Sequence, residues 1–496
     1  MMKHVVIVHC HYESGGVTQV VQNHVAALHD FARPATEFRI VLAGGDRTGG
    51  LSESARQQVQ FWSLPALDYD ELHVTSDSPT ADHRGKSLAK DLMDRMSSSA
   101  MTPEDTIIHW HNHSLGKNAA APHAIAALAD QGWTLLLQVH DFAEDQRPEN
   151  VVYLKEQYDA PEMRQLQQIL YPVSDHVAYA TLTRGDADIF RAFGLPDDRI
   201  TVLPNSVRLP AGELPTRDAA MRKLSNAFGI APESRWILYP VRGIRRKNVG
   251  EFLLLCQLLG FATSDDAGPI IGGLTLKPDT PLERASYERW RRVADKHVTN
   301  VVFDAAHHRE VSFLDNLAAC EAVVSTSVAE GFGMAFLEPW LAGRRVIARN
   351  LPGVTADFRE AGLKLNQLYD RVDVLVDDRW SDFAGLHTNQ QIEVIAKLSE
   401  DHSYQQQISQ ANQSLLNWFL ERPDESVIAH NATRIRERFG LTNQAHNLIT
   451  AYQSIREAQP IRNWQSQATI AELVEAAHPA YPCRVEQHIA NVGDDC

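Results

Sequence analysis

The chain has 496 residues, of which 44% are hydrophobic and 22% are charged, a composition typical of globular proteins. This length exceeds what one ordinary hydrophobic core needs, and it predicts two domains with additional elements. The formal net charge of −16 argues against nucleic acid or an anionic membrane surface as the main partner, although it is compatible with a local basic pocket.

The amino terminus and the cysteines predict a soluble cytoplasmic protein. The apolar run Val5–Val8 is too short for the core of a signal peptide, and no cleavage site follows it. No apolar run approaches the roughly 20 residues that cross a bilayer. Without paired spacing, the cysteines are expected to be free thiols in a reducing compartment; they are Cys10, Cys256, Cys320, Cys483 and Cys496.

The first 208 residues alternate short apolar runs with amphipathic ones. Strands are predicted at 4–9, 38–43, 58–64, 106–110, 134–139, 177–182 and 199–203. Helices are predicted at 17–28, 87–96, 119–130 and 184–193. Such alternation predicts a parallel sheet with helices on both faces.

The alternation restarts after Pro204–Pro215, whose proline and polar residues predict an interdomain hinge. The following elements are strands at 236–241, 269–276, 301–303, 321–326 and 345–348, with helices at 249–259, 282–296, 311–318 and after Gly333. From about residue 390 the sequence is mainly helical. We predict an α/β protein with Rossmann-like domains at 1–208 and 209–435, facing each other across a cleft, and a helical segment 436–496 that can pack back on the first domain.

Two carboxylates bracket a glycine turn in the second domain. Glu330 and Glu338 flank Gly331-Phe332-Gly333, which follows the predicted strand 321–326 and leads into a helix. Such a turn presents backbone N–H groups and the positive end of a helix dipole to an anion. Glu338, about one turn into the helix, would repel phosphate but can accept hydrogen bonds from sugar hydroxyls. The pattern therefore predicts a nucleotide sugar as ligand.

Other polar residues also follow predicted strands, where ligands bind in doubly wound sheets. These residues are Gly15, Gly16, His109, His111, His113, His140, Arg242 and Lys247. Fixed cations such as Arg242 and Lys247 can stabilise the charge that a nucleotide diphosphate gains as a glycosidic bond breaks. Arg245 and Arg246 are interpreted as solvated residues of the same loop.

In their order, these motifs resemble the donor site of the retaining GT-B glycosyltransferases of family 4. The similarity covers roughly residues 4 to 360 and rests chiefly on Arg242, Lys247, Glu330 and Glu338, with the Gly15-Gly16 loop as a weaker match. The resemblance implies transfer of a hexosyl group from a nucleotide-diphosphate sugar to an acceptor hydroxyl, with retention of anomeric configuration. It also implies that catalysis needs no metal and no other cofactor.

The resemblance further implies a role for each site residue. Arg242 and Lys247 would hold the diphosphate, and Glu338 would bind the ribose. The donor sugar and phosphate would meet Glu330 and the backbone of the turn, which comprises Gly331, Phe332, Gly333, Met334 and Ala335. Gly15 and Gly16 would let the backbone approach the diphosphate, and His140 would lie beside the anomeric centre. Pro339 departs from the family pattern and is predicted to kink the helix.

His109, His111 and His113 alternate, so they would share one face of a continuing strand. We expect them on the acceptor side, with a soluble metabolite or saccharide as acceptor because the chain is acidic. One alternative function is a metal-dependent hydrolase that uses these three histidines as ligands. Another is a GT-B-type nucleotide-sugar epimerase or a sugar phosphorylase.

Overall fold

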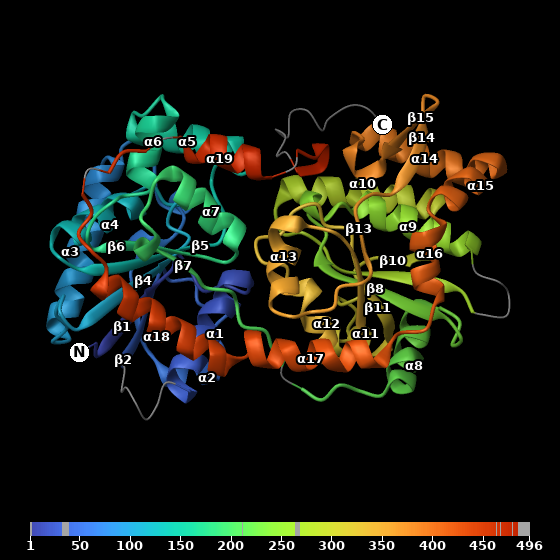
Figure 1. Cartoon of the computed structure of the whole chain (residues 1–496), viewed down its shortest axis with the longest axis horizontal. Helices are drawn as coiled ribbons and strands as arrows, with labels where there is room; N and C mark the ends of the chain where they lie inside the picture. The colour runs from blue at the N-terminus through green and yellow to red at the C-terminus, as the bar shows by residue number, and fades with distance from the viewer. Residues whose placement is uncertain are drawn as a thin grey trace. The chain divides into compact units, whose positions relative to one another are not determined.

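The computed structural model describes residues 2–31, 39–210, 212–262, 268–462, 464–466, 468–478 and 480–484. The chain divides into two compact units (Figure 1). Unit 1 holds the described residues of Met1–Ser206 and Phe439–Pro479, and unit 2 holds those of Val207–Arg438 and from Ala480 on. The segment 436–496, expected to form one carboxy-terminal piece, is therefore shared between the two units.

Unit 1 is built on a seven-stranded sheet of order β3-β2-β1-β4-β5-β6-β7, in which every neighbouring pair is parallel. The strands are β1 His4–Val8, β2 Arg39–Gly44, β3 Gln60–Ser63, β4 Thr106–His111, β5 Thr134–Val139, β6 Val177–Thr181 and β7 Ile200–Val202. Every residue of β4 and β5 is buried, as expected for strands with helices on both faces. Each strand predicted in this half is present.

Helices cover the sheet of unit 1 on both faces. They are α1 Gly16–Asp30, α2 Glu53–Gln58, α3 Ala81–Ser98, α4 Ala120–Asp130, α5 Pro148–Tyr158, α6 Met163–Leu170, α7 Arg184–Phe193, α18 Leu441–Glu457 and α19 Ile470–Ala477. Helix α18 lies against α1 and shares its apolar core, through Leu448 and Tyr452 among others (Figure 1). A segment far away in sequence thus completes one face of the first sheet.

Unit 2 is built on a six-stranded parallel sheet of order β10-β9-β8-β11-β12-β13. Its strands are β8 Arg235–Arg242, β9 Ile270–Leu276, β10 Val301–Val302, β11 Cys320–Ser325, β12 Arg345–Arg349 and β13 Leu368–Tyr369. A separate antiparallel pair consists of β14 Asp373–Val376 and β15 Arg379–Asp382. The predicted α/β class with two parallel sheets is confirmed.

The helices of unit 2 are α8 Arg217–Phe228, α9 Val249–Ala262, α10 Pro281–His297, α11 Phe313–Ala319, α12 Glu338–Leu341, α13 Pro352–Glu360, α14 Thr388–Glu400, α15 His402–Ala411, α16 Gln413–Leu420 and α17 Glu425–Phe439. Helix α9 is buried from Val249 to Leu259, which fits its apolar sequence on all sides. The sequence analysis missed α8 and α13. Pro352 favours the first turn of α13, where a missing N–H has no cost.

The helix expected after Gly333 is broken into two short pieces. A 3-10 turn at Met334–Phe336 is followed by α12, and Leu337 between them has φ −117°. Pro339 lies in the first turn of α12, where proline is tolerated. Glu338 is therefore the first residue of a four-residue helix, not a residue one turn inside a longer one. The predicted helix-dipole contribution is correspondingly small, because few peptide dipoles are aligned here.

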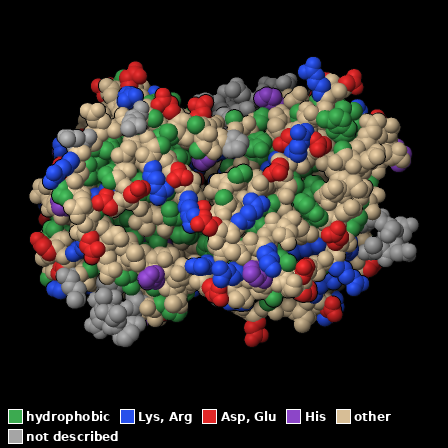
Figure 2. Space-filling view, viewed as in Figure 1, with side chains coloured by type: hydrophobic (Ala, Val, Ile, Leu, Met, Phe, Trp, Pro, Cys, Tyr) green, Lys and Arg blue, Asp and Glu red, His purple; other side chains and the backbone are tan. Residues whose placement is uncertain are grey.

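The surface and the cysteines show two further features. None of the helices described is both long and apolar enough to cross a membrane. Cys10, Cys256, Cys320 and Cys483 are free thiols, as predicted, and Cys496 lies outside the described residues. Figure 2 shows acidic and basic side chains interspersed over the face that is drawn.

A buried ion pair holds the end of β12 against α9. The Arg349 guanidinium donates to both carboxylate oxygens of Glu251, at 3.0 and 2.6 Å, and also to Asp382 at 2.8 and 3.0 Å. Side chains of Arg349 and Glu251 are 1% and 0% exposed. Glu251 also accepts hydrogen bonds from Tyr369 and from Asn248, the residue after Lys247. This network therefore links the sheet to the loop that follows β8.

We predict that Arg349→Ala lowers the free energy of unfolding by about 3–5 kcal/mol, because it leaves the Glu251 carboxylate buried without its cation. The measurement is urea unfolding followed by tryptophan fluorescence. Arg217→Ala is the control, since Arg217 pairs with Glu321 at 2.7 Å but is 42% exposed; its cost should stay below about 1 kcal/mol. Equal losses in the two variants would contradict the network's role.

Candidate functional site

Lys247 and Glu330 form a largely buried ion pair in unit 2. Lys247 follows β8 and Glu330 follows β11, and these strands are parallel neighbours, so their carboxyl ends lie at the same edge of the sheet. Lys247 Nζ lies 2.5 Å from Glu330 Oε1, and the side chains are 12% and 9% exposed. A pair this sheltered is screened little by salt. The two residues that the sequence placed at strand ends are thus brought together.

Hydrogen bonds join the two loops that carry the pair. Tyr239 donates its hydroxyl to the Lys247 carbonyl at 2.6 Å, and Thr326 Oγ1 donates to the carbonyls of Lys247 and Asn248 at 3.1 and 3.0 Å. The Val328 N–H donates to the Arg246 carbonyl at 3.0 Å. Asn248 takes φ +49°, which turns the chain from the loop into α9. Hydrogen bonds therefore hold the backbone carbonyls of three consecutive residues, Arg246, Lys247 and Asn248.

The charge state of Glu330 follows from its surroundings. Burial by itself would raise the pKa of this carboxyl, but Lys247 and Arg246 outweigh that effect, and the net pKa is lowered. The carboxylate form of Glu330 is therefore favoured beside Lys247. Arg246, interpreted as a solvated residue, instead acts on Glu330, which corrects that prediction.

The bend at Gly331–Gly333 is held in place by packing against aromatic side chains. Gly333 has φ +85°, and a Cβ there would lie 3.0 Å from Val354 and 3.1 Å from Phe336, so the position requires glycine. Phe332 is buried edge-on against Phe358 of α13, with ring centroids 5.5 Å apart. The other three residues of the bend, Gly331, Met334 and Ala335, are only half-buried. Gly331 has no side chain, so its exposed surface is backbone that a ligand can reach.

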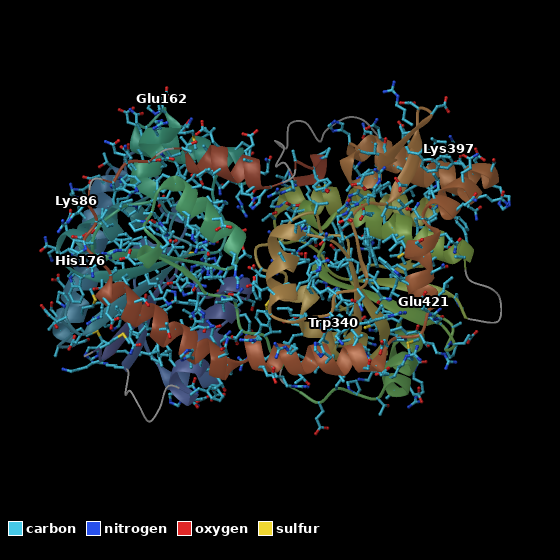
Figure 3. All side chains as sticks on the ribbon, viewed as in Figure 1. Lys86, Glu162, His176, Trp340, Lys397 and Glu421 are labelled. Carbon is cyan, nitrogen blue, oxygen red and sulfur yellow. The ribbon has the colours of Figure 1, made fainter. Side chains whose placement is uncertain are left out.

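Glu338 is a sheltered carboxyl without a partner. Its side chain makes no hydrogen bond or ion pair with any residue that the structure describes, and burial raises its pKa to about 7. Helix α12, which begins at Glu338, is anchored by Trp340, labelled in Figure 3, whose Nε1 donates to the Phe336 carbonyl at 2.9 Å. A buried carboxylate is costly unless donors reach it, so ligand hydroxyls would relieve this cost.

Arg242 at the end of β8 and Arg245 of the loop that follows it each form an ion pair of their own. Arg242 is exposed and its guanidinium pairs with Asp279 at 2.6 Å. Arg245 is structural, because its backbone N–H and its Nε both bind Glu283, at 2.8 and 3.2 Å, and its side chain is 13% exposed. The interpretation of Arg245 as a solvated residue was therefore wrong.

Gly15 and Gly16 begin α1 in unit 1. Gly15 has an extended backbone, with φ 179°, that any residue can adopt, and a Cβ at Gly16 would meet no atom within 4 Å. The first turn of α1 contains no acidic residue, and no side chain caps it. The fold itself does not require glycine at these positions. The space beside them is open, so a ligand can contact the protein backbone there.

His140 is held by its neighbours on the adjacent strand end. Its Nε2 lies 2.9 Å from Nδ1 of His111, and its backbone N–H donates to Asn112 Oδ1 at 3.1 Å. Burial lowers the pKa of His140 to about 4, so the ring is neutral at pH 7. Among the described residues Nδ1 has no partner. A neutral imidazole with one nitrogen available can form a hydrogen bond with a hydroxyl. It has no positive charge with which to attract a phosphate.

The three histidines of the His109–His113 run do not share one face, which corrects the prediction. His109 and His111 stack with ring centroids 4.4 Å apart. Strand β4 ends at His111, and Asn112 takes φ +57°, so the alternation stops there. His113 instead donates from Nε2 to the Leu170 carbonyl at 2.8 Å, beside Tyr171 and Tyr179. The proposed hydrolytic metal site of these three residues is not assembled.

Burial also argues against direct acceptor contact by this run. His109, His111 and His113 are 0%, 1% and 3% exposed. Their place on the acceptor side stays a prediction; in the structure these three side chains offer little surface to a ligand, and His111 contacts His140. The residue that joins His109 and His111 is His24 of α1, which sequence analysis did not single out.

Sequence reasoning missed several residues that shape the site around Lys247 and Glu330. Two of them, Tyr239 and Thr326, donate to the Lys247 carbonyl. The third, Ser327, has its hydroxyl 2.8 Å from that of Tyr239. One signal was available: Ser325-Thr326-Ser327 directly follows an apolar strand, and all three are 0% exposed. Buried hydroxyls need partners, and the neighbouring loop supplies them.

Comparisons with known proteins support the fold. No family model matches the chain. It is 26% identical over 377 residues to mannosylglucosyl-3-phosphoglycerate synthase of Petrotoga mobilis, an alignment that spans 75% of this chain and 69% of that protein. Among solved structures it resembles HepE of Anabaena in complex with UDP and glucose (TM-score 0.55, 13% identity, 92% of this chain and 100% of that chain). It also resembles sucrose-phosphate synthase of Thermosynechococcus elongatus (TM-score 0.56, 13% identity, 92% and 100%). The chain has the GT-B fold.

The raised pKa of Glu338 predicts a pH-dependent change in stability. The folded state holds this proton up to about pH 7, whereas the unfolded chain loses it near the ordinary carboxyl value of 4.5. Ionisation therefore destabilises the fold as pH rises between these values. At pH 8, Glu338→Gln should be more stable than the wild type by up to about 3 kcal/mol, and the gain should vanish by about pH 4.5.

Urea unfolding at pH 4.5, 6 and 8 measures this difference. Glu310→Gln serves as the matched control, because the side chain of Glu310 is 61% exposed. A gain from Glu338→Gln that is the same at all three pH values would show that the carboxyl is not titrating in this range.

Proposed function

We propose that this protein is a glycosyltransferase that moves a hexosyl group from a nucleotide-diphosphate sugar to an acceptor hydroxyl, with retention of anomeric configuration. The observation that carries the proposal is the buried Lys247–Glu330 pair beside the Gly331–Gly333 bend and the unpartnered Glu338. One sheet edge thus offers a cation, accessible backbone and a carboxyl, which match a phosphate and sugar hydroxyls. The comparisons support the same class of donor, since HepE was solved with UDP and glucose.

Donor binding divides between these groups. Lys247 contacts the diphosphate, and the backbone of Gly331, Met334 and Ala335 donates to it and to the sugar. Glu338 has no hydrogen-bond partner among the described residues, and it accepts hydrogen bonds from the ribose hydroxyls instead. Arg242 exchanges its exposed pair with Asp279, which is worth little in water, for a phosphate oxygen. Gly15 and Gly16 let the backbone of α1 approach the diphosphate.

The transfer step uses the departing phosphate as the base. The bond between the anomeric carbon and the phosphate oxygen breaks, and the acceptor oxygen bonds to that carbon from the same face. The acceptor proton passes to the phosphate oxygen. Negative charge grows on the diphosphate as the bond breaks, so the fixed Lys247 stabilises the transition state more than the ground state. Neutral His140 contacts a hydroxyl of the transferred sugar through Nδ1.

The acceptor is proposed to be a small hydroxylated metabolite or a saccharide. The Petrotoga relative is named for a product in which sugars are joined to phosphoglycerate, so phosphorylated glycosides are the first acceptors to test. Uridine diphosphate sugars are the first donors, by analogy with the HepE complex. No observation favours an epimerase or a phosphorylase over the transferase.

We predict that Lys247→Ala reduces kcat by about 10²–10³-fold, the loss seen when one preorganised donor to a developing charge is removed. Product formation is followed by mass spectrometry with uridine and guanosine diphosphate sugars and a panel of glycosyl acceptors. Lys223→Ala is a matched control, because Lys223 pairs with Asp315 at 2.7 Å in the same unit but lies outside the site.

Thermal shift with UDP separates binding from chemistry. A ligand of the folded state raises Tm, and the rise should be large for the wild type and the Lys223 variant and small for Lys247→Ala and Glu338→Ala. If Lys247→Ala keeps the turnover and the UDP shift of Lys223→Ala, the cation has no part in donor binding or transfer, and the proposal fails.

A further inference from the structure

A cavity of about 400 Å³ lies in unit 1 among three segments that follow strands of its sheet. The stretch from the 3-10 turn Asp70–Leu72 to Ser76 follows β3, Gly116 and Lys117 follow β4, and helix α5 follows β5. Ligands of doubly wound sheets bind beyond the carboxyl ends of the strands. Small-molecule sites typically have volumes of roughly 300–1,000 Å³. The cavity therefore has the place and the size of a small-molecule site.

The walls of this cavity are joined through Asp70, which is 4% exposed. Its carboxylate accepts from the Tyr153 hydroxyl of α5 at 2.7 Å and from the Ala119 N–H at 2.6 Å. The Arg84 guanidinium donates to the other carboxylate oxygen at 2.6 Å, and the Asp70 N–H donates to the Lys117 carbonyl at 2.8 Å. The three segments are therefore held together by the protein itself.

The loop after β4 also packs closely on α5. Gly116 has φ +83°, and a Cβ there would lie 3.0 Å from Cβ of Asn150 and 3.1 Å from Cδ1 of Leu154. The Asn150 amide donates to the Leu115 carbonyl at 2.7 Å. Because these walls are already fixed, a ligand pays little conformational entropy to order them.

The side chains that line the cavity are almost all polar. Apart from Val74, each of them ends in a group that can donate or accept a hydrogen bond. On α5, Asn150, Tyr153 and Gln157 recur at i, i+3 and i+7, so one face of the helix presents two amides and a phenol ring. Such a lining does not suit an apolar ligand, because burying polar groups without partners costs free energy.

The charge of the lining does not favour an anion. Asp70 is paired with Arg84, whereas the Lys117 ammonium forms no ion pair with a described residue. The exposed side chains of Glu71 and Glu149 also line the cavity. Two carboxylates against one ammonium disfavour a phosphorylated or carboxylated ligand.

We propose that this cavity binds one neutral sugar unit. Sugar hydroxyls both donate and accept hydrogen bonds, which matches the amides, hydroxyls and carboxylates of the lining. The apolar C–H face of a sugar ring can stack on the half-buried ring of Tyr153. The unit can belong to the acceptor, away from its reacting hydroxyl, or to a separate saccharide. Binding itself does not depend on the proposed transferase activity.

The test is calorimetric titration of the full-length protein with maltose, sucrose and methyl α-mannopyranoside. We expect millimolar binding of at least one of these probes to the wild type. Ser76→Trp, which places an indole in the cavity, should weaken this binding at least about 10-fold. Ser97→Trp on α3 is the matched control, because Ser97 is also exposed but does not line the cavity. The Tm rise with UDP should be the same in both variants, which separates this site from the proposed donor site in unit 2.

Two substitutions at Tyr153 test the role of its ring. Tyr153→Phe and Tyr153→Leu both remove the hydrogen bond to Asp70, but only the leucine variant removes the aromatic face. Affinity for the neutral probe should be about 2- to 10-fold lower for Tyr153→Leu than for Tyr153→Phe.

Kinetics with a working acceptor identify the source of the sugar unit. Ser76→Trp should raise the acceptor KM at unchanged kcat when the unit is part of the acceptor, and it should leave KM unchanged when the unit is a separate saccharide.

Three results would overturn the proposal. The first is that no probe binds to the wild type, and the second is that the wild type, Ser76→Trp and Ser97→Trp bind the probes equally. The third is that glucose 6-phosphate binds more tightly than glucose and that Lys117→Met removes the difference, which would identify an anion site.

Discussion

The proposed donor site of this protein depends on one ion pair, between Lys247 and Glu330. Burial opposes the charge on Glu330, and the two cations Lys247 and Arg246 outweigh burial, so the carboxylate persists and holds the ammonium in place. Around the pair, the Tyr239 and Thr326 hydroxyls fix the Lys247 backbone, and the Arg349–Glu251 network reaches the same loop through Asn248. In the proposed reaction, a cation fixed in this way needs little rearrangement when a diphosphate gains charge beside it, so the packing of unit 2 would contribute to catalysis.

Much of the fold follows from hydrophobic periodicity. The apolar runs of the first half all form strands, because strands buried on both faces must be apolar throughout. Placing Lys247 and Glu330 at strand exits was enough to bring them together, since β8 and β11 are parallel neighbours. Gly333 is also explained locally, because its positive φ and the close Val354 and Phe336 side chains demand glycine.

Predictions from the sequence were wrong where a single backbone angle, or a segment far away in sequence, determines the local structure. Asn112 in the left-handed region ends the alternation of β4 and sends His113 to the opposite side of the sheet from His109. Leu337 splits the helix around Glu338, so the expected dipole is mostly absent. The partner of His109 on α18, Tyr452, lies 343 residues away in sequence, and no local pattern indicates that contact. The same holds for His24, whose position inside an amphipathic helix is indistinguishable from an ordinary core residue.

A crystal structure of the protein with UDP bound tests the proposed role of the Lys247–Glu330 pair most directly. We expect Lys247 Nζ within hydrogen-bond distance of a phosphate oxygen, and ribose hydroxyls that donate to Glu338 beside the Gly331–Gly333 bend. A nucleotide bound elsewhere, with the Lys247–Glu330 pair and Glu338 untouched by it, would show that these residues do not form the donor site.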